Sequence, residues 1–326
     1  MNSDSIDKEI LQNMYRDMWR IRKFEYAVAE CVNRGLVSGP HLYIGEEAIA
    51  VGVCTALRSD DYITTTHRGH GHCIAKGGQM KPMLAELLAK ETGYCKGKGG
   101  SMHIADVSSG ILGANGIVGG GIPIAAGAAL GALVQKRDWV AVGFFGDAAS
   151  NTGSFHEALN LASVWKLPVV YVCEHNSFGM FTPSADSTSV DDISIRAKSY
   201  NIPGITVDGN DILAVYGATK EAIERARSGK GPTLIECKTR RQLGHYQGDT
   251  QRYRNPDDIK HTKEIDPLPR FQKHLISSNI ITEALACEIE TKAQTEAEEA
   301  IQFAIDSPEP DLSELTKDVY IPFKPI

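Results

Sequence analysis

Two short apolar runs lie near the middle of the chain, at residues 140–145 and 168–173, with a segment of helical character between them. Short continuous apolar runs are typical of buried strands. Residues 154–162 repeat their apolar side chains at helical spacing, and polar residues suited to an N-cap stand at their start. This order predicts a β-α-β unit, which is right-handed and sets its two strands parallel.

The rest of the chain extends this unit into a larger α/β fold. Further helical segments are expected at about 8–34, 212–227 and 282–305, and further strands at 62–66, 205–209 and 233–239. We predict a parallel sheet flanked by helices in a single domain, 1–326, with an N-terminal helix over about 8–34 and a C-terminal helical tail over about 265–326. The polar segment 240–261 is expected to be irregular, like loops that cover active sites.

Asp147 and Asn176 follow the two central strands. Parallel strands of one β-α-β unit end at the same edge of the sheet, where open α/β folds bind ligands, so the two side chains should meet there. A carboxylate and an amide oxygen suit Mg²⁺, which completes its shell with water and the oxygens of a bound diphosphate. The alternative is that Asp147 caps a helix and Asn176 shapes a turn, which are the commonest uses of Asp and Asn at such positions.

Composition excludes several classes of partner. The net charge of -7 and the pI near 5.8 argue against nucleic acid or an anionic membrane, which call for a basic surface. The seven cysteines are scattered without a C-x-x-C pair, which indicates a reducing compartment rather than a disulfide framework or a zinc site. No secretory or membrane-spanning pattern is evident, so we expect a cytoplasmic protein or one whose targeting peptide has been removed.

Residues 67–72 read His-Arg-Gly-His-Gly-His after a predicted strand. Three histidines within six residues could form a metal cluster, but two of the intervening positions are glycine and no carboxylate follows at ligand spacing. An arginine at a strand end, beside glycines that let a phosphate approach, better suits diphosphate binding. This pattern singles out Arg68.

Two glycine-rich stretches resemble nucleotide motifs without matching them. Residues 93–99 contain a Gly-Lys pair but are one residue short of a P-loop and lack the Ser or Thr that follows its lysine. Residues 113–123 do not follow a strand, so they are not a dinucleotide fingerprint, although their glycines let the backbone pass close to a ligand or another chain. A nucleotide-dependent enzyme is therefore disfavoured.

The central unit resembles a thiamine-diphosphate motif, usually written G-D-G … N-N. Ala148 stands in place of its last glycine and His175 in place of its first asparagine. Over essentially the whole chain, the order of features resembles the alpha subunits of thiamine-diphosphate-dependent E1 enzymes of the pyruvate, branched-chain 2-oxoacid and acetoin dehydrogenase complexes. The matching positions are His41, His67-Arg68, Gly116 to Val118, Asp147, Asn176 and Gly244-His245. Pyruvate enzymes typically have Tyr-Arg at 67 and 68, so the histidine string is more similar to the acetoin branch.

The resemblance implies a transketolase-like thiamine-diphosphate-binding fold and a role for each matching residue. Asp147, Asn176 and the backbone carbonyl of Phe178 would hold Mg²⁺. Arg68 would contact the diphosphate. The catalytic histidines His41 and His245 would lie by the thiazolium and the substrate, as groups that titrate near neutrality. Further contacts to the cofactor would come from His67, Gly116, Val118, Gly146, Ala148, Ala149 and His245.

The implied activity is that of an oxidoreductase with thiamine diphosphate and Mg²⁺ as cofactors. Such an E1 enzyme cleaves the bond next to the carbonyl of acetoin, or decarboxylates pyruvate, and passes a two-carbon unit to a lipoyl group on an E2 acyltransferase. In this family a separate beta chain supplies the glutamate that activates the aminopyrimidine. We therefore expect an α2β2 heterotetramer and an inactive isolated alpha chain.

Two alternatives remain open. One is a branched-chain 2-oxoacid E1 alpha subunit. The other is a non-catalytic α/β assembly subunit, in which Ala148 and His175 mark a decayed site. Tyr246 occupies the place of the regulatory phosphoserine of animal pyruvate enzymes, so that phosphorylation switch is expected to be absent.

Overall fold

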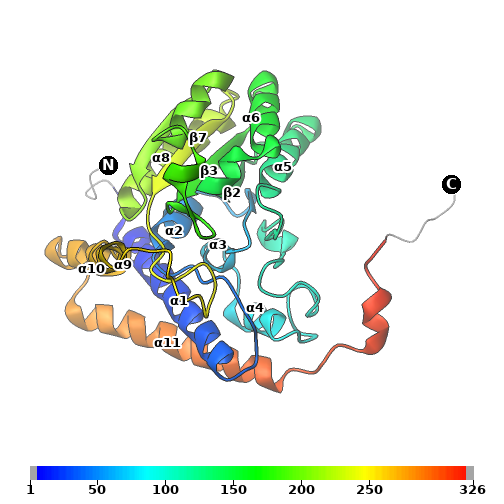
Figure 1. Ribbon diagram of the computed structural model, residues 1–326, viewed down its shortest axis with the longest axis vertical. Coiled ribbons are helices and arrows are strands. Elements are labelled where there is room, and N and C mark those ends of the chain that lie inside the picture. Colours follow the sequence, from blue (N-terminus) through cyan, green and yellow to red (C-terminus); the bar gives the residue numbers. More distant parts are fainter. Residues whose placement is uncertain (1–5, 321–326) are drawn as a thin grey trace.

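A five-stranded parallel sheet forms the centre of the computed structural model, which describes residues 6–320 (Figure 1). The strand order is β1-β2-β3-β7-β6, and every neighbouring pair is parallel. The strands are β1 (Tyr62–Thr64), β2 (Ala141–Gly146), β3 (Val169–His175), β6 (Gly204–Asp208) and β7 (Thr233–Lys238), and a small antiparallel pair comprises β4 (Phe178–Gly179) and β5 (Thr182–Pro183). The predicted α/β fold with a parallel sheet is confirmed.

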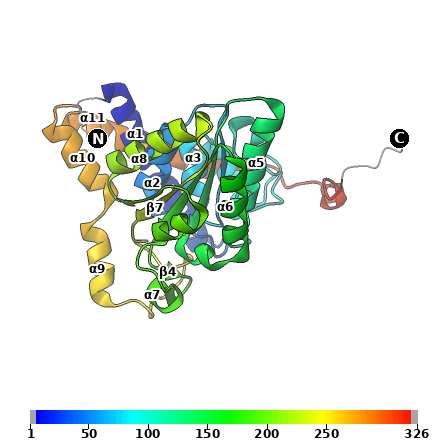
Figure 2. The same ribbon diagram turned by 90° about the horizontal axis from the view of Figure 1, so that it is seen from above.

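Helices cover both faces of the sheet (Figure 2). α5 and α6 lie on one face, and α8 and α2 lie on the other, with α1 and α11 side by side beyond them. The helices are α1 (Lys8–Asn33), α2 (Glu47–Thr55), α3 (His70–Ala75), α4 (Met80–Leu87), α5 (Gly121–Gln135), α6 (Gly153–Trp165), α7 (Ser184–Ser187), α8 (Ile212–Arg227), α9 (Pro256–Glu264), α10 (Pro267–Ser277) and α11 (Glu283–Asp306). Short 3₁₀ helices are η2 (Val107–Ser109), η3 (Asp147–Asn151), η4 (Ile193–Tyr200) and η5 (Leu312–Thr316).

The predicted β-α-β unit is β2-α6-β3. Both strands are buried along nearly their whole length, and Thr152 caps α6 by accepting a hydrogen bond from the backbone N–H of Phe155. The register pairs Gly146 with Glu174, so the chain leaves both strands at the same edge of the sheet. This edge is the carboxyl end of the strands, as the sequence predicts.

Two peripheral segments match the predictions in part. The N-terminal helix is α1, and the C-terminal tail contains α10 and α11, while residues 321–326 of that predicted tail lie outside the described residues. The expectation of an irregular segment over 240–261 is wrong at its end, because α9 begins at Pro256. Asn255 caps this helix by accepting from the N–H of Asp257, and a proline at the first helical position has a backbone angle suited to a helix.

Across the described part of the chain, none of the helices is both long and apolar enough to cross a membrane.

The P-loop-like stretch has a structural use. Its backbone N–H groups at Cys95, Gly97, Gly99 and Gly100 all donate to the buried carboxylate of Glu86, at 2.7 to 3.1 Å. A ring of backbone N–H groups is what binds a phosphate in a true P-loop. Here a side chain of the same protein occupies that ring, which agrees with the sequence argument against a nucleotide site.

Candidate active site

A cavity of about 330 Å³ opens at the carboxyl edge of the sheet, a size suited to a small-molecule or cofactor site. Every residue that the sequence singled out for binding or catalysis lines it. These residues are His41, His67, Arg68, Gly116, Val118, Gly146, Asp147, Ala148, Ala149, Asn176, Phe178 and His245. Sequence analysis missed three charged members of the lining, Glu46, Glu174 and Arg241. Arg241 follows β7 closely, so the strand-end rule that identified Asp147 could have found it.

Asp147 stands at the end of β2 with its carboxylate buried in the cavity wall. Among residues 6–320, its Oδ2 atom has no hydrogen-bond partner, and the side chain is only 3% exposed. Burial raises the pKa of Asp147 above its usual value. The Nε2 atom of His175 lies 4.0 Å from this oxygen, beyond hydrogen-bond distance. A buried carboxylate oxygen without a hydrogen-bond partner is costly, as expected of a group that binds a cation.

Asn176 follows β3 and lines the same cavity. Its Nδ2 atom donates to Glu46 Oε1 at 3.0 Å, and its Oδ1 atom accepts weakly from the N–H of Phe178 at 3.4 Å. Burial and the neighbouring Glu174 raise the pKa of Glu46 to about 7. The topology thus places a carboxylate and an amide oxygen on one cavity, as required by the predicted metal site.

The two departures from the usual thiamine-diphosphate motif are accommodated differently. The His175 ring is held by its neighbours: its Nδ1 contacts Glu236 Oε1 at 2.6 Å, and its Nε2 contacts Ser184 Oγ at 3.1 Å and lies 4.0 Å from Asp147 Oδ2. The methyl group of Ala148 faces Gly179, and a Cβ added to Gly179 would lie 2.7 Å from it. Gly179, which has no side chain, therefore leaves the space that the methyl group of Ala148 needs.

Gly179→Ala should lower the free energy of unfolding by about 1–3 kcal/mol, because two methyl groups cannot occupy this space without a backbone shift. Ala148→Gly should relieve the clash in the double variant. Thermal unfolding of the two single variants and the double variant measures the coupling. Additive effects of the two substitutions would contradict the predicted contact.

Two arginines from distant segments meet in the cavity. Arg68 is buried and donates to the carbonyls of Leu42 at 2.7 Å and His245 at 2.8 Å. Burial, followed by the nearby Arg241, lowers the pKa of Arg68 to about 10, so it stays charged at neutral pH. Arg241 contacts His245 Nδ1 at 3.1 Å. This pair makes the cavity attractive to an anion such as a diphosphate.

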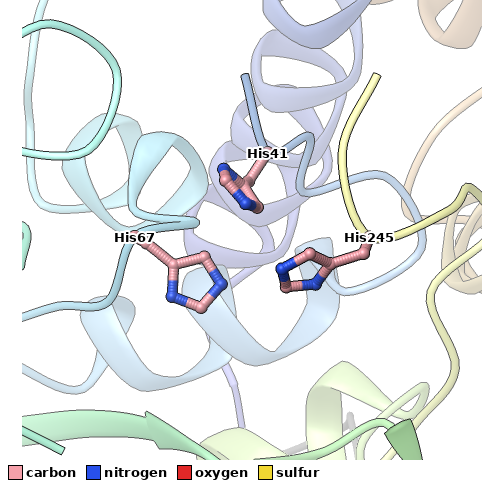
Figure 3. Close-up of side chains that lie close together, drawn as sticks. All are labelled: His41, His67 and His245. Atoms are coloured by element: carbon pink, nitrogen blue, oxygen red, sulfur yellow. The ribbon is translucent and has the colours of Figure 1, made fainter. Parts of the chain in front are cut away.

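Three imidazole rings, from His41, His67 and His245, converge in the cavity (Figure 3). The ring centroids of His41 and His67 are 4.7 Å apart, and those of His41 and His245 are 4.8 Å apart. One nitrogen from each of the three lies within 4.8 Å of the others, which is close to the spacing in a metal site. However, the two neighbouring guanidinium groups would repel a bound cation. We therefore interpret the three rings as hydrogen-bonding groups.

The three histidines are neutral in the chain without ligands. Burial first, and then the charge of Arg68, lower the pKa of His41 to about 3, that of His67 to about 2 and that of His245 to about 4. The expectation that His41 and His245 titrate near neutrality is therefore wrong for this state. The cause is tertiary, because Arg68 and the enclosing walls come from other parts of the chain.

These lowered pKa values predict acid sensitivity. An unfolded histidine binds a proton below about pH 6.5, whereas these folded ones do not, so the unfolded state takes up more protons. The stability that results is fully present above pH 6.5 and should be lost as the pH falls toward 4. His67→Gln should make the decline in unfolding temperature shallower across this range. An unchanged slope would show that His67 already binds a proton when folded.

The other two histidines of the 67–72 string are parts of the core. His70 contacts the carboxylate of Glu25 at 3.1 Å, and His72 contacts Glu174 Oε1 at 2.9 Å. Both rings are fully buried, and neither lies within ligand distance of the group formed by His41, His67 and His245. A metal cluster within the string is therefore not supported among the described residues, because His70 and His72 each have another buried partner.

Comparisons with known proteins agree with this site. The family model described as "Dehydrogenase E1 component" matches residues 15–313. The alpha subunit of acetoin:2,6-dichlorophenolindophenol oxidoreductase of Bacillus subtilis (strain 168) is 51% identical, over 98% of this chain and 96% of that protein. The protein of the same name from Cupriavidus necator is 45% identical over the same shares of the two chains.

A pyruvate dehydrogenase relative is more distant. The E1 component subunit alpha of Rhizobium meliloti (strain 1021) is 38% identical, over 94% of this chain and 89% of that protein. The matches span nearly the whole chain, and the acetoin relatives share more residues with it than the pyruvate relative does. The chain therefore belongs to the dehydrogenase E1 component family and groups, among its alpha subunits, with the acetoin branch.

Proposed function

We propose that this chain is the alpha subunit of an E1 enzyme that cleaves acetoin and passes the two-carbon unit to a lipoyl group on an acyltransferase. Membership in the E1 component family implies thiamine diphosphate as the cofactor. Two relatives named for acetoin, at 51% and 45% identity, support acetoin over pyruvate as the substrate. The observation that carries the proposal is the buried carboxylate of Asp147, in a cavity lined by the predicted site residues.

Mg²⁺ would be held by Asp147, Asn176 and the backbone carbonyl of Phe178. The donor set suits this ion, because Mg²⁺ prefers oxygen ligands and leaves room for diphosphate oxygens. The missing partner of Asp147 Oδ2 within the described chain supports a cation at this point. The Ala148 methyl group faces Gly179, which has no side chain to clash with it.

Binding of the diphosphate would rest on Arg68 and on backbone groups. Arg68 is charged and held by two carbonyls, so it can orient an anion without reorganising. Further contacts would come from the backbones of Gly116, Val118, Gly146, Ala148 and Ala149 and from the rings of His67 and His245. When bound, thiamine diphosphate supplies the carbon nucleophile and the electron sink for cleavage next to a carbonyl.

His41 and His245 would serve the substrate end of the cavity. A neutral imidazole can accept a hydrogen bond from the hydroxyl group of acetoin, whose proton must leave on cleavage. Neutralisation of Arg68 by a bound diphosphate would raise the pKa of these histidines and so favour proton transfer. His41 Nδ1 is buried and lacks a hydrogen-bond partner among residues 6–320, so it is available to a ligand. His245 is steadied because its backbone N–H donates to Asp249 Oδ2 at 2.7 Å.

We infer that a beta chain completes the site and that the working unit is an α2β2 heterotetramer. The two acetoin relatives are named as subunits, which supports a multi-chain enzyme. Ile117 and Val118 at the cavity rim are 74% and 51% exposed, and apolar side chains at the mouth of a site favour a covering partner. The carboxylate that activates the aminopyrimidine would come from that partner.

The test is dye reduction by this chain alone and together with its beta partner, with Mg²⁺ and thiamine diphosphate present. Acetoin, pyruvate and a branched-chain 2-oxoacid are supplied in parallel reactions. We expect turnover only in the two-chain mixture and fastest with acetoin. Turnover by the single chain would refute the inferred need for a partner, and preference for another substrate would refute the acetoin assignment. Partner binding without any cofactor requirement would indicate the non-catalytic alternative.

A further inference from the structure

Glu46 is a buried carboxylate in the cavity that the proposed function does not use. It directly precedes α2, and its side chain is 1% exposed. Its Oε1 atom accepts from Asn176 Nδ2 at 3.0 Å. Its Oε2 atom lies 3.8 Å from Arg68 Nε and, within the described residues, has no hydrogen-bond partner. Glu46 thus stands between a proposed metal ligand and a proposed diphosphate-binding residue.

The contact with Glu46 determines which end of the Asn176 amide faces the cavity. An amide has a donor end and an acceptor end, and only the oxygen can bind a metal ion. Glu46 Oε1 accepts from Asn176 Nδ2, so the amide turns its NH₂ group toward Glu46. The N–H of Phe178, on the other end of the amide, is a donor and requires Oδ1 there. The two contacts agree on one orientation of Asn176.

We propose that Glu46 is a positioning residue for the metal site. It holds the Asn176 amide with Oδ1 available to the metal ion, and its second carboxylate oxygen faces the guanidinium of Arg68. This role rests on the proposed function, because it presupposes a metal ion at Asp147 and Asn176. In this role Glu46 acts through these two side chains and is not itself a ligand of the metal ion or of the diphosphate.

The first test removes the acceptor. In the enzyme assembled with its beta partner, Mn²⁺ replaces Mg²⁺ as the probe, and its dissociation constant is measured by electron paramagnetic resonance with thiamine diphosphate present. Glu46→Met should weaken Mn²⁺ binding about tenfold, which is the lower end of the effects seen for partners of metal ligands. Glu46→Gln keeps an oxygen that can accept from Asn176, so its dissociation constant should stay within about threefold of the wild type.

The second test reverses donor and acceptor. Asn176→Asp offers the metal a carboxylate but places it against Glu46, so two acceptors face each other. Adding Glu46→Gln supplies a donor, and the double variant should bind Mn²⁺ about tenfold more tightly than Asn176→Asp alone. Glu46→Gln therefore has little effect in the wild-type background and a favourable effect in the Asn176→Asp background, which a merely structural role would not produce.

Glu47→Gln is the matched control. Glu47 is an equally buried carboxylate at the next position in the chain, but it is bound by Arg22 and the N–H of Gly45 rather than by Asn176. Glu47→Gln should not rescue Asn176→Asp. Equal rescue by the control, or an unchanged dissociation constant in Glu46→Met, would overturn the positioning role while leaving the metal site intact. Absence of Mn²⁺ binding by the wild-type enzyme would instead contradict the proposed function.

Discussion

Asp147→Asn should abolish cofactor-dependent turnover and, at the same time, make the unliganded chain more stable. Asparagine has the same shape as aspartate, so the cavity wall keeps its packing. The charge that attracts the metal ion is lost, and turnover should fall to the background level. The unfolding free energy should rise by about 1 kcal/mol or more, because a carboxylate whose charged form is disfavoured by burial is replaced by a neutral amide.

Three measurements check this prediction. Dye reduction is followed with the beta partner present, Mn²⁺ binding is followed by electron paramagnetic resonance, and thermal unfolding is followed without metal or cofactor. Asp60→Asn makes the same chemical change at an exposed position and should alter none of the three. Turnover that survives in Asp147→Asn would contradict the metal assignment. A less stable variant would mean that the carboxylate has a structural partner.

Arg68→Lys should raise the concentration of thiamine diphosphate needed for half-maximal turnover by about 100-fold. Lysine keeps the positive charge but cannot reproduce the planar fork that reaches two carbonyls at once. These carbonyls belong to Leu42 and His245, which are far apart in the sequence. The substitution should therefore also loosen the segment that carries His245 and lower kcat.

Arg227→Lys is the control for this substitution. Arg227 also uses both terminal nitrogens, Nη1 to the carbonyl of Asp138 and Nη2 to the carboxylate of Asp61, but it lies at the opposite edge of the sheet, where β1 and β2 begin. Its replacement should lower the unfolding temperature and leave the cofactor requirement unchanged. The cofactor requirement is measured by titrating thiamine diphosphate into apoenzyme at saturating Mg²⁺. A similar requirement in the wild type and Arg68→Lys would show that charge alone is sufficient.

The sequence was most informative where local pattern and chain handedness decide the outcome. The β2-α6-β3 unit follows from two apolar runs and a capped helix, and its handedness brings Asp147 and Asn176 to one edge of the sheet. The family resemblance then placed the remaining candidate residues, and all of them line the cavity. Local signals were weaker at α9, where the Asn-Pro start of a helix lay inside a polar segment.

By itself, the sequence determined the parallel α/β unit and the residue types at its carboxyl edge, because both depend on neighbours along the chain. Only the tertiary structure decided how those residues are paired and charged. Glu46 meets Asn176 across 130 positions of the chain, and Arg68 meets His245 across 177. Burial and these distant charges keep His41 and His245 neutral, and neither effect can be read from local sequence, since a pKa depends on everything packed around the group.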